Sequence, residues 1–322
     1  MRVTKQILAA VGLAAACAGA VAQPYPSKPI RFVVATAAGG ASDIVARTVA
    51  ERMQDGLGQP IVVEAKPGAN GNLAAEYVAR AAPDGYTMMM GTIGVMAINV
   101  SMYRNTPFDP LTDFTAVAPL VSFSNMLVVR PDLPVKNVKE LIEYARANPG
   151  KLRYGSPGSG GSPHMAMVVF GQMNNLDLVH VPYKGAAAAL NDLIGGHIDM
   201  AFSDPLVTTP QVKAGRVRAL AVSGPQRLES APDIPTVAEA GVPGFSVVGW
   251  LGIVVPAGTP RDRILMLNAE ANKALANPDV RKRLIDNGAL ITPGTPDDFD
   301  KLVRSEHARW KKVVTESKLV VD

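Results

Sequence analysis

Hydrophobic runs alternate with segments of helical spacing along most of this chain. Ile30 to Ala35 is an apolar run, interrupted by Arg31 alone and rich in β-branched residues, which is typical of a strand buried on both faces. After a glycine pair, apolar residues recur at every fourth position from Val45 to Leu57 and mark one face of an amphipathic helix. The pattern therefore predicts a strand, a tight loop and a helix in immediate succession.

The same alternation continues through the first third of the chain. It predicts strands at 61–64, 86–91 and 116–121 and a helix at 72–82. Strands that alternate with helices indicate an α/β fold with a parallel, doubly wound sheet. Ligands bind beyond the carboxyl ends of such strands, so we expect the loops after Ala35, Glu64 and Met90 to share one edge. The last of these loops contains Thr92.

A second cycle of strands and helices begins after residue 122. Its first strand, at 152–155, leads into a glycine-rich loop, and Ser162 followed by Pro163 predicts a serine cap at a helix start. Residues 224–244 are rich in proline and glycine and are typical of a connector. A strand at 247–255 then precedes helices that have no predicted strand of their own to cover.

These returning helices are best placed on the first sheet. We therefore predict two lobes, each a mostly parallel sheet flanked by helices. Lobe 1 comprises residues 23–122 and 247–322, and lobe 2 comprises residues 123–246. Two connections between two lobes predict a cleft that closes on a ligand.

Two glycine-rich loops, one in each predicted lobe, form the main candidate site. Each follows a strand and opens a helix, so its free backbone amides and the helix dipole favour an anion such as a carboxylate. For either loop alone the alternative is a simple tight turn, and for Ser42 and Asp43 it is capping of the helix. The residues that these loops offer for contact with a solute are Gly39, Gly40, Ser42 and Asp43, and then Ser156, Gly158, Ser159, Gly160, Ser162 and His164.

Other side chains extend the candidate site. Tyr183 and Lys184 end a strand and could place a phenol and a cation at the cleft, although a solvated lysine in a turn is an equal alternative. Asp204 also follows a strand, where it could receive an amine or a water, or cap the next helix. We assign Trp250 to core or hinge packing.

The sequence shows no enzyme, metal or cofactor motif. His164 is not arranged with a serine as in a known nucleophile motif, and the other histidines lack the spacing of metal ligands. We therefore predict no catalytic residue, no metal and no cofactor.

The first 22 residues are typical of an export signal. A short basic start and an apolar run precede Ala20-Val21-Ala22, which predicts cleavage after Ala22 and a periplasmic protein. Removal of this signal lowers the formal net charge from +4 to +2, and no long basic run remains, so nucleic acid is not an expected partner. The signal also contains the single cysteine, Cys17, whose alternative role is a lipidated N-terminus.

Several short motifs together resemble the Bug-type solute-binding proteins, the extracytoplasmic receptors of tripartite tricarboxylate transporters. The resemblance covers nearly the whole chain after the signal, and its order and spacing are more specific than any single motif. The motifs are Tyr25 to Ile30, Gly39 to Asp43, Lys66 to Gly71, Ala82 to Tyr86, Tyr183 to Gly185, Leu220 to Val222 and Pro256 to Pro260.

The resemblance implies a two-lobed type II periplasmic-binding-protein fold. It also implies a receptor that needs no covalent step, captures a small carboxylate and delivers it to membrane transporter subunits or a sensor. It implies that Thr36, Ala38, Gly39, Gly40 and Asp43 belong to the first binding loop, and that Ser156, Gly158, Ser159, Ser162 and His164 belong to the second. A monomer is expected.

The chain departs from the family pattern at two places. Ala37 and Ala38 stand where the first loop usually has a proline before its glycine pair, so this loop is expected to be less rigid. Ser203 stands where many relatives have an acid, and the acid comes one place later at Asp204, which weakens an inference that the solute carries an amine.

Two other classes of function remain as alternatives. One is an exported hydrolase or lyase that uses His164 with a nearby serine or with Asp204. The other is the effector domain of a transcription regulator, which the export signal and the lack of a DNA-binding segment disfavour. The identity of the solute stays open among mono-, di- and tricarboxylates and aromatic acids.

Overall fold

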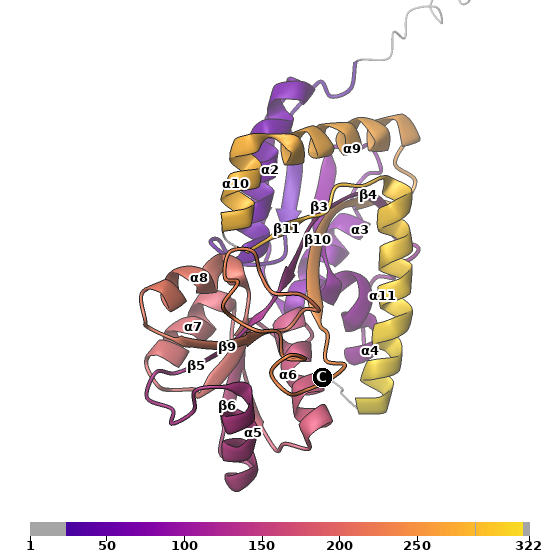
Figure 1. Ribbon diagram of the computed structural model, residues 1–322. Coiled ribbons are helices and arrows are strands. Elements are labelled where there is room, and N and C mark those ends of the chain that lie inside the picture. Colours follow the sequence, from indigo (N-terminus) through magenta and orange to yellow (C-terminus); the bar gives the residue numbers. More distant parts are fainter. Residues whose placement is uncertain (1–23, 287, 318–322) are drawn as a thin grey trace, which may run out of the picture.

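The computed structural model describes residues 24–286 and 288–317, so the predicted export signal and Cys17 lie outside the described residues. Two mixed sheets, each flanked by helices, form two layered units that lie one above the other in Figure 1. The predicted two-lobed α/β fold is confirmed.

The first sheet has the strand order β11-β4-β10-β3-β1-β2. β1 pairs in parallel with β2 and β3, whereas β10 is antiparallel to both β3 and β4. β10 differs in direction because the chain enters it on its return from the second sheet. The strands are β1 (Ile30–Val34), β2 (Ile61–Ala65), β3 (Thr87–Thr92), β4 (Phe114–Ser124), β10 (Val248–Pro256) and β11 (Leu290–Ile291).

The second sheet has the strand order β7-β6-β8-β5-β9. β6 is parallel to β7 and β8, and β5 is antiparallel to its two neighbours. Both sheets are therefore mixed: β10 and β11 run opposite to the other strands of the first sheet, and β5 runs opposite to those of the second. The strands are β5 (Met126–Val129), β6 (Arg153–Ser156), β7 (Val179–Pro182), β8 (Met200–Ser203) and β9 (Arg218–Val222).

Helices cover both faces of each sheet (Figure 1). Those of the first unit are α2 (Ala41–Leu57), α3 (Asn72–Ala79), α4 (Asn99–Met102), α9 (Arg261–Ala276), α10 (Pro278–Asp286) and α11 (Pro296–Ser317), with the short helices η2 (Ala69–Gly71) and η3 (Gly94–Ile98). Those of the second are α5 (Val138–Ala147), α6 (Ser162–Asn174), α7 (Ala186–Ile194) and α8 (Pro205–Lys213).

Burial on both faces explains why β1 is apolar apart from the exposed Arg31. Phe32 and Val34 pack into the core beneath α2 and α9, while Val33 faces the opposite core, which contains Trp310 of α11. The three β1 side chains have no exposed surface. The C-terminal helices return to this first sheet, and the two-residue strand β11, which the sequence pattern did not predict, pairs there with β4.

The chain passes between the sheets twice, between β4 and β5 and between β9 and β10. Ser223 joins the two passages, because its Oγ accepts a hydrogen bond from the Asn125 amide (2.8 Å) and donates one to the Val247 carbonyl (2.5 Å). All three residues are buried or nearly so. We propose that these two hydrogen bonds hold the hinge between the lobes, and that the lobe boundaries lie at residues 122 and 246.

Candidate functional site

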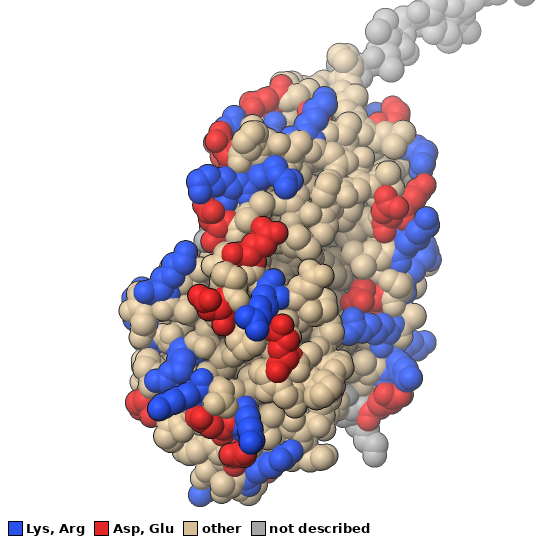
Figure 2. Space-filling model, viewed as in Figure 1, with Lys and Arg blue, Asp and Glu red and all other residues tan. Residues whose placement is uncertain are grey.

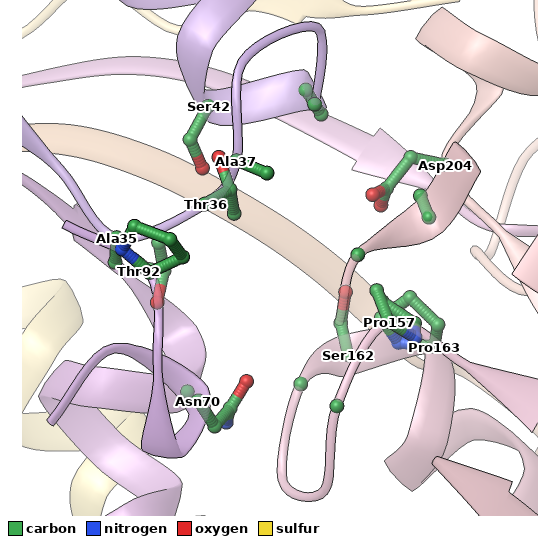
Figure 3. A pocket seen from close by; sticks show the side chains of 18 of the residues that line it. Ala35, Thr36, Ala37, Ser42, Asn70, Thr92, Pro157, Ser162, Pro163 and Asp204 are labelled. Atoms are coloured by element: carbon green, nitrogen blue, oxygen red, sulfur yellow. The ribbon is translucent and has the colours of Figure 1, made fainter. Parts of the chain in front are cut away.

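A cavity of about 670 Å³ lies where the carboxyl ends of strands from both sheets meet (Figure 3). The loops after β1, β2 and β3 line it on the side of the first sheet, and those after β6, β7 and β8 line it on the other. This is the edge at which open α/β sheets bind ligands.

The N-terminus of α2 forms one wall of the cavity. Its N-cap residue is Gly40, which has no side chain to satisfy the first amides of the helix. Asp43 does not cap these amides but accepts a hydrogen bond from the amide of Gly39 (3.0 Å) and pairs with Arg47 (2.9 Å). The carboxylate therefore shapes the loop, and the helix terminus stays open to the cavity.

The N-terminus of α6 forms the facing wall. The helix begins at Ser162, so the N-cap is Gly161 and not the serine, a shift of one residue from the sequence prediction. Gly161 provides no side-chain cap. The shift frees the Ser162 side chain, which is buried and lines the cavity beside Pro157 and Pro163 (Figure 3).

The two walls touch beside the cavity. The Tyr103 hydroxyl donates to the Ser159 carbonyl (3.2 Å). Gly160 packs so closely against Asn70 and Asn99 that an added Cβ would lie 3.0 Å and 2.9 Å from their side-chain atoms. Asn70 and Asn99 are themselves joined, because Asn70 Nδ2 donates to Asn99 Oδ1 (2.9 Å). Loops and short helices of both units thus close this side of the cavity.

The structure brings most of the predicted site residues to the cavity wall. These are Thr36, Ala38, Gly40, Thr92, Gly158, Ser159, Ser162, Tyr183 and Asp204. The remaining predicted residues do not line the cavity; these are Gly39, Asp43, Ser156, Gly160 and His164. Solute binding by these residues stays a prediction. We expect the lining residues to contact the solute and the others to support the loops.

His164 belongs to a stack that supports the second loop from behind. Its ring lies 4.1 Å from that of His180, which lies 4.9 Å from that of Tyr154. His164 Nδ1 accepts a hydrogen bond from the Gly160 amide (3.0 Å), and His180 Nε2 bonds Ser156 Oγ (2.7 Å). Burial lowers the pKa of His164 to about 3 and that of His180 to about 4, so both rings are neutral at pH 7.

Asp204 lies at the opposite end of the site from Thr36. Its carboxyl group points into the cavity (Figure 3), and its Oδ1 is buried without a hydrogen-bond partner among the described residues. Burial raises the pKa of Asp204 to about 7. The preceding Ser203 points elsewhere, since its Oγ accepts a hydrogen bond from Thr208 (2.6 Å). The acid that reaches the cavity is therefore Asp204, and the position before it does not contribute.

Some residues that line the cavity were not predicted as site residues. Trp250 packs edge-on against Phe299, as expected of a core residue, but it also lines the cavity. Asn70, from the motif Lys66 to Gly71, and Pro157, from the second glycine-rich loop, line the cavity although no contact with a solute was predicted for them. Only folding shows which face of a loop turns to the cleft, so no sequence signal distinguished these residues. Lys184, by contrast, lines the cavity as the sequence suggested.

Charge is mixed on the face in Figure 2, where basic and acidic side chains are interspersed. In the part of the chain that the structure describes, no group of histidine, cysteine and acidic side chains is arranged to hold a metal ion. Within the same residues, no helix is both long and apolar enough to cross a membrane.

Comparison with known proteins identifies relatives along nearly the whole chain. Residues 45–319 match the family described as "Tripartite tricarboxylate transporter family receptor". A protein encoded in the tcbD-tcbE intergenic region of a Pseudomonas species is 37% identical over 319 residues, which cover 98% of this chain and 95% of the relative.

Solved structures agree with this match. An R. palustris protein solved with adipate is 36% identical and has a TM-score of 0.89, covering 92% of this chain and 99% of its own. The periplasmic binding protein BugD is 34% identical with a TM-score of 0.87, covering 92% and 99%. The Bug-type resemblance is confirmed, and the hydrolase or lyase alternative is not supported. The chain belongs to the tripartite tricarboxylate transporter receptors, a family of periplasmic solute-binding receptors and not of enzymes.

Proposed function

We propose that this protein captures a small organic carboxylate in the cavity and delivers it to the membrane subunits of a tripartite tricarboxylate transporter. The observation that carries the proposal is the pair of helix N-termini, those of α2 and α6, that open on one cavity without a side-chain cap. Each terminus offers unpaired amides and the positive end of a helix dipole.

The remaining cavity wall suits the same class of solute. The hydroxyl of Thr36 is buried without a partner, and Ser42 and Ser162 add further hydrogen-bond donors. Lys184, an exposed side chain at the wall, is the basic residue among the described lining residues and attracts an anion to the entrance. A carboxylate that contacts both helix termini binds the closed form more tightly than an open one, so binding favours closure.

The relatives support the ligand class and the partner. The R. palustris relative was solved with adipate, and the family is one of transporter receptors. We further propose that the protein reaches the periplasm through the signal at residues 1–22, with cleavage after Ala22, and acts there as a monomer that does not bind nucleic acid. Presentation to a sensor protein instead of a transporter is the alternative partner.

Thermal shift measurements test the ligand class. The mature protein, refolded to remove bound solute, is screened against organic acids and the matching amides. We expect an acid to raise the melting temperature while its amide does not, because a ligand that binds the native state stabilises it. A folded protein that responds to no acid, or equally to acid and amide, would contradict the proposal.

A pair of threonine variants then locates the site. Thr36→Val removes the unpaired cavity hydroxyl, and we expect it to weaken carboxylate binding about tenfold, since a hydrogen bond to a charged group contributes about 1.5 kcal/mol. Thr315→Val is the matched control, because that hydroxyl bonds Lys311 on the exposed side of α11. Equal affinities of the two variants would place the solute elsewhere.

A further inference from the structure

Asp204 is the single acidic side chain among the described residues that line the cavity. It is 8% exposed, and its carboxyl group faces Thr36 and Ala37 across the cavity (Figure 3). No ion pair among the described residues includes it, and Oδ1 has no hydrogen-bond partner. A buried acid that points into a binding cavity without a partner is a polar group prepared for a ligand.

The local backbone explains why Asp204 stays unpaired. It is the N-cap of α8, a position at which aspartate ordinarily accepts a hydrogen bond from the first turn, yet its side chain makes no capping bond. The amide of Val207, the third residue of the helix, donates instead to the backbone carbonyl of Asp204 (3.2 Å). The carboxyl group is therefore free to face the cavity.

The neighbouring titratable groups do not offset the effect of burial on the pKa of Asp204. Tyr183 donates its hydroxyl to Asp192 of α7 (2.7 Å), and Lys184 is exposed. His164 and His180 are stacked behind the second loop and bond Gly160 and Ser156. β5, which pairs with the preceding strand β8, carries no ionisable side chain, and neither does β10, whose Trp250 lines the same cavity. Burial is consequently the one cause that raises the pKa of Asp204, to about 7.

The protonation state decides what Asp204 can bind. Ionised, it would repel a carboxylate and leave a charged, buried Oδ1 without a donor, which costs far more than a neutral oxygen in the same place. Protonated, it gains an O–H that can donate to a solute oxygen. A carboxylic acid kept neutral by apolar surroundings is a known hydrogen-bond donor in protein sites.

We propose that protonated Asp204 donates a hydrogen bond to the distal carboxylate of a dicarboxylate whose first carboxylate lies at the helix termini. This inference rests on the proposed function and extends it from a carboxylate to a dicarboxylate. The bound pair holds one proton between two carboxyl groups, and that proton comes from the solvent when Asp204 is ionised in the free protein. Binding is therefore linked to proton uptake.

Calorimetry tests the linkage directly on the wild-type protein. The mature protein is titrated with straight-chain dicarboxylates of three to eight carbons, including adipate, and with the monocarboxylates of equal length, at pH 6, 7 and 8. We expect one dicarboxylate to bind with proton uptake, seen as a dependence of the binding heat on the ionisation enthalpy of the buffer. Its affinity should rise up to about tenfold per unit of falling pH above the pKa of Asp204. The matching monocarboxylate should bind more weakly and without proton uptake.

Two variants and a control assign the effect to this residue. Asp204→Asn is neutral at every pH and retains a donor, so it should keep the dicarboxylate but lose the proton uptake. Asp204→Leu should lower dicarboxylate affinity to that of the monocarboxylate. Asp233→Asn, at an exposed aspartate in the connector, should behave as wild type.

The other possible outcomes contradict either the role of Asp204 or the proposed function. Binding at pH 8 without proton uptake, or with the same uptake in Asp204→Asn, refutes the role of Asp204 while leaving the carboxylate receptor intact. Proton release, with a preference for solutes that carry an amine, shows an ionised Asp204 that binds a cation. Failure of every carboxylate to bind the folded wild type at all three pH values refutes the proposed function itself.

Discussion

The variant Gly160→Ala should hinder closure of the cavity around a ligand more than it destabilises the fold. Gly160 has φ +93, and an added Cβ would lie 2.7 Å from Met102 Cε, 2.9 Å from Asn99 Oδ1 and 3.0 Å from Asn70 Nδ2. The methionine can move its flexible end. Asn99 cannot retreat freely, because it is fully buried and its Nδ2 donates to the Asn70 carbonyl (3.1 Å) and to Asn72 Oδ1 (2.5 Å).

The expected loss of affinity follows from the two hydrogen bonds of Asn99 that must break in the variant. Loss of two hydrogen bonds at about 0.5–1.5 kcal/mol each costs the closed form about 1–3 kcal/mol. An open form does not make this contact, so the cost falls on closure and lowers the apparent affinity for a carboxylate about 5- to 150-fold. The positive φ adds roughly 1 kcal/mol of backbone strain in both forms, which lowers the melting temperature but not the affinity.

Gly196→Ala is the matched control for the strain. Gly196 has φ +75 in an exposed turn, and an added Cβ there meets no atom within 4 Å. We expect both variants to lose similar stability in thermal unfolding, and only Gly160→Ala to lose affinity in calorimetry. If both variants bind as wild type, the contact between the loops does not belong to the bound form and the reasoning fails.

Three further predictions concern the hinge, the histidine stack and the tryptophan. Ser223→Ala leaves the Asn125 amide and the Val247 carbonyl without their bonds, so chemical denaturation should show a loss of about 1–3 kcal/mol, and an unchanged value would remove Ser223 from the hinge. The pKa values of His164 and His180 are lowered from an ordinary 6.5, so the unfolded chain takes up protons first as the pH falls. In urea unfolding of Asp204→Asn, which removes the opposite effect of the raised pKa of Asp204, stability should therefore decline from pH 6.5 toward pH 4, whereas a flat profile would contradict this. Trp250→Phe should abolish the fluorescence change on ligand binding, because Trp250 lines the cavity; an equal change in the variant would assign the signal elsewhere.

Much of the fold was predictable because it depends on local and periodic features. The apolar run of β1 reports burial on both faces, and the spacing from Val45 to Leu57 reports the buried face of α2. The strand β11 was missed because two residues, one exposed and one half-buried, carry no periodic signal. The serine cap of α6 was misplaced by one residue because Ser162 and Gly161 are both acceptable N-caps.

The sequence by itself determined that two glycine loops each follow a strand and open a helix, since backbone conformation at these positions depends on adjacent residues. Only the tertiary structure decided that both helix termini open on one cavity, that His164 supports a loop from behind, and that Asp204 faces the cavity without a partner. These properties depend on which groups from distant segments lie within a few ångströms of one another. Hydrogen-bond partners and burial, and hence the pKa of Asp204, are therefore set by packing and not by the local sequence.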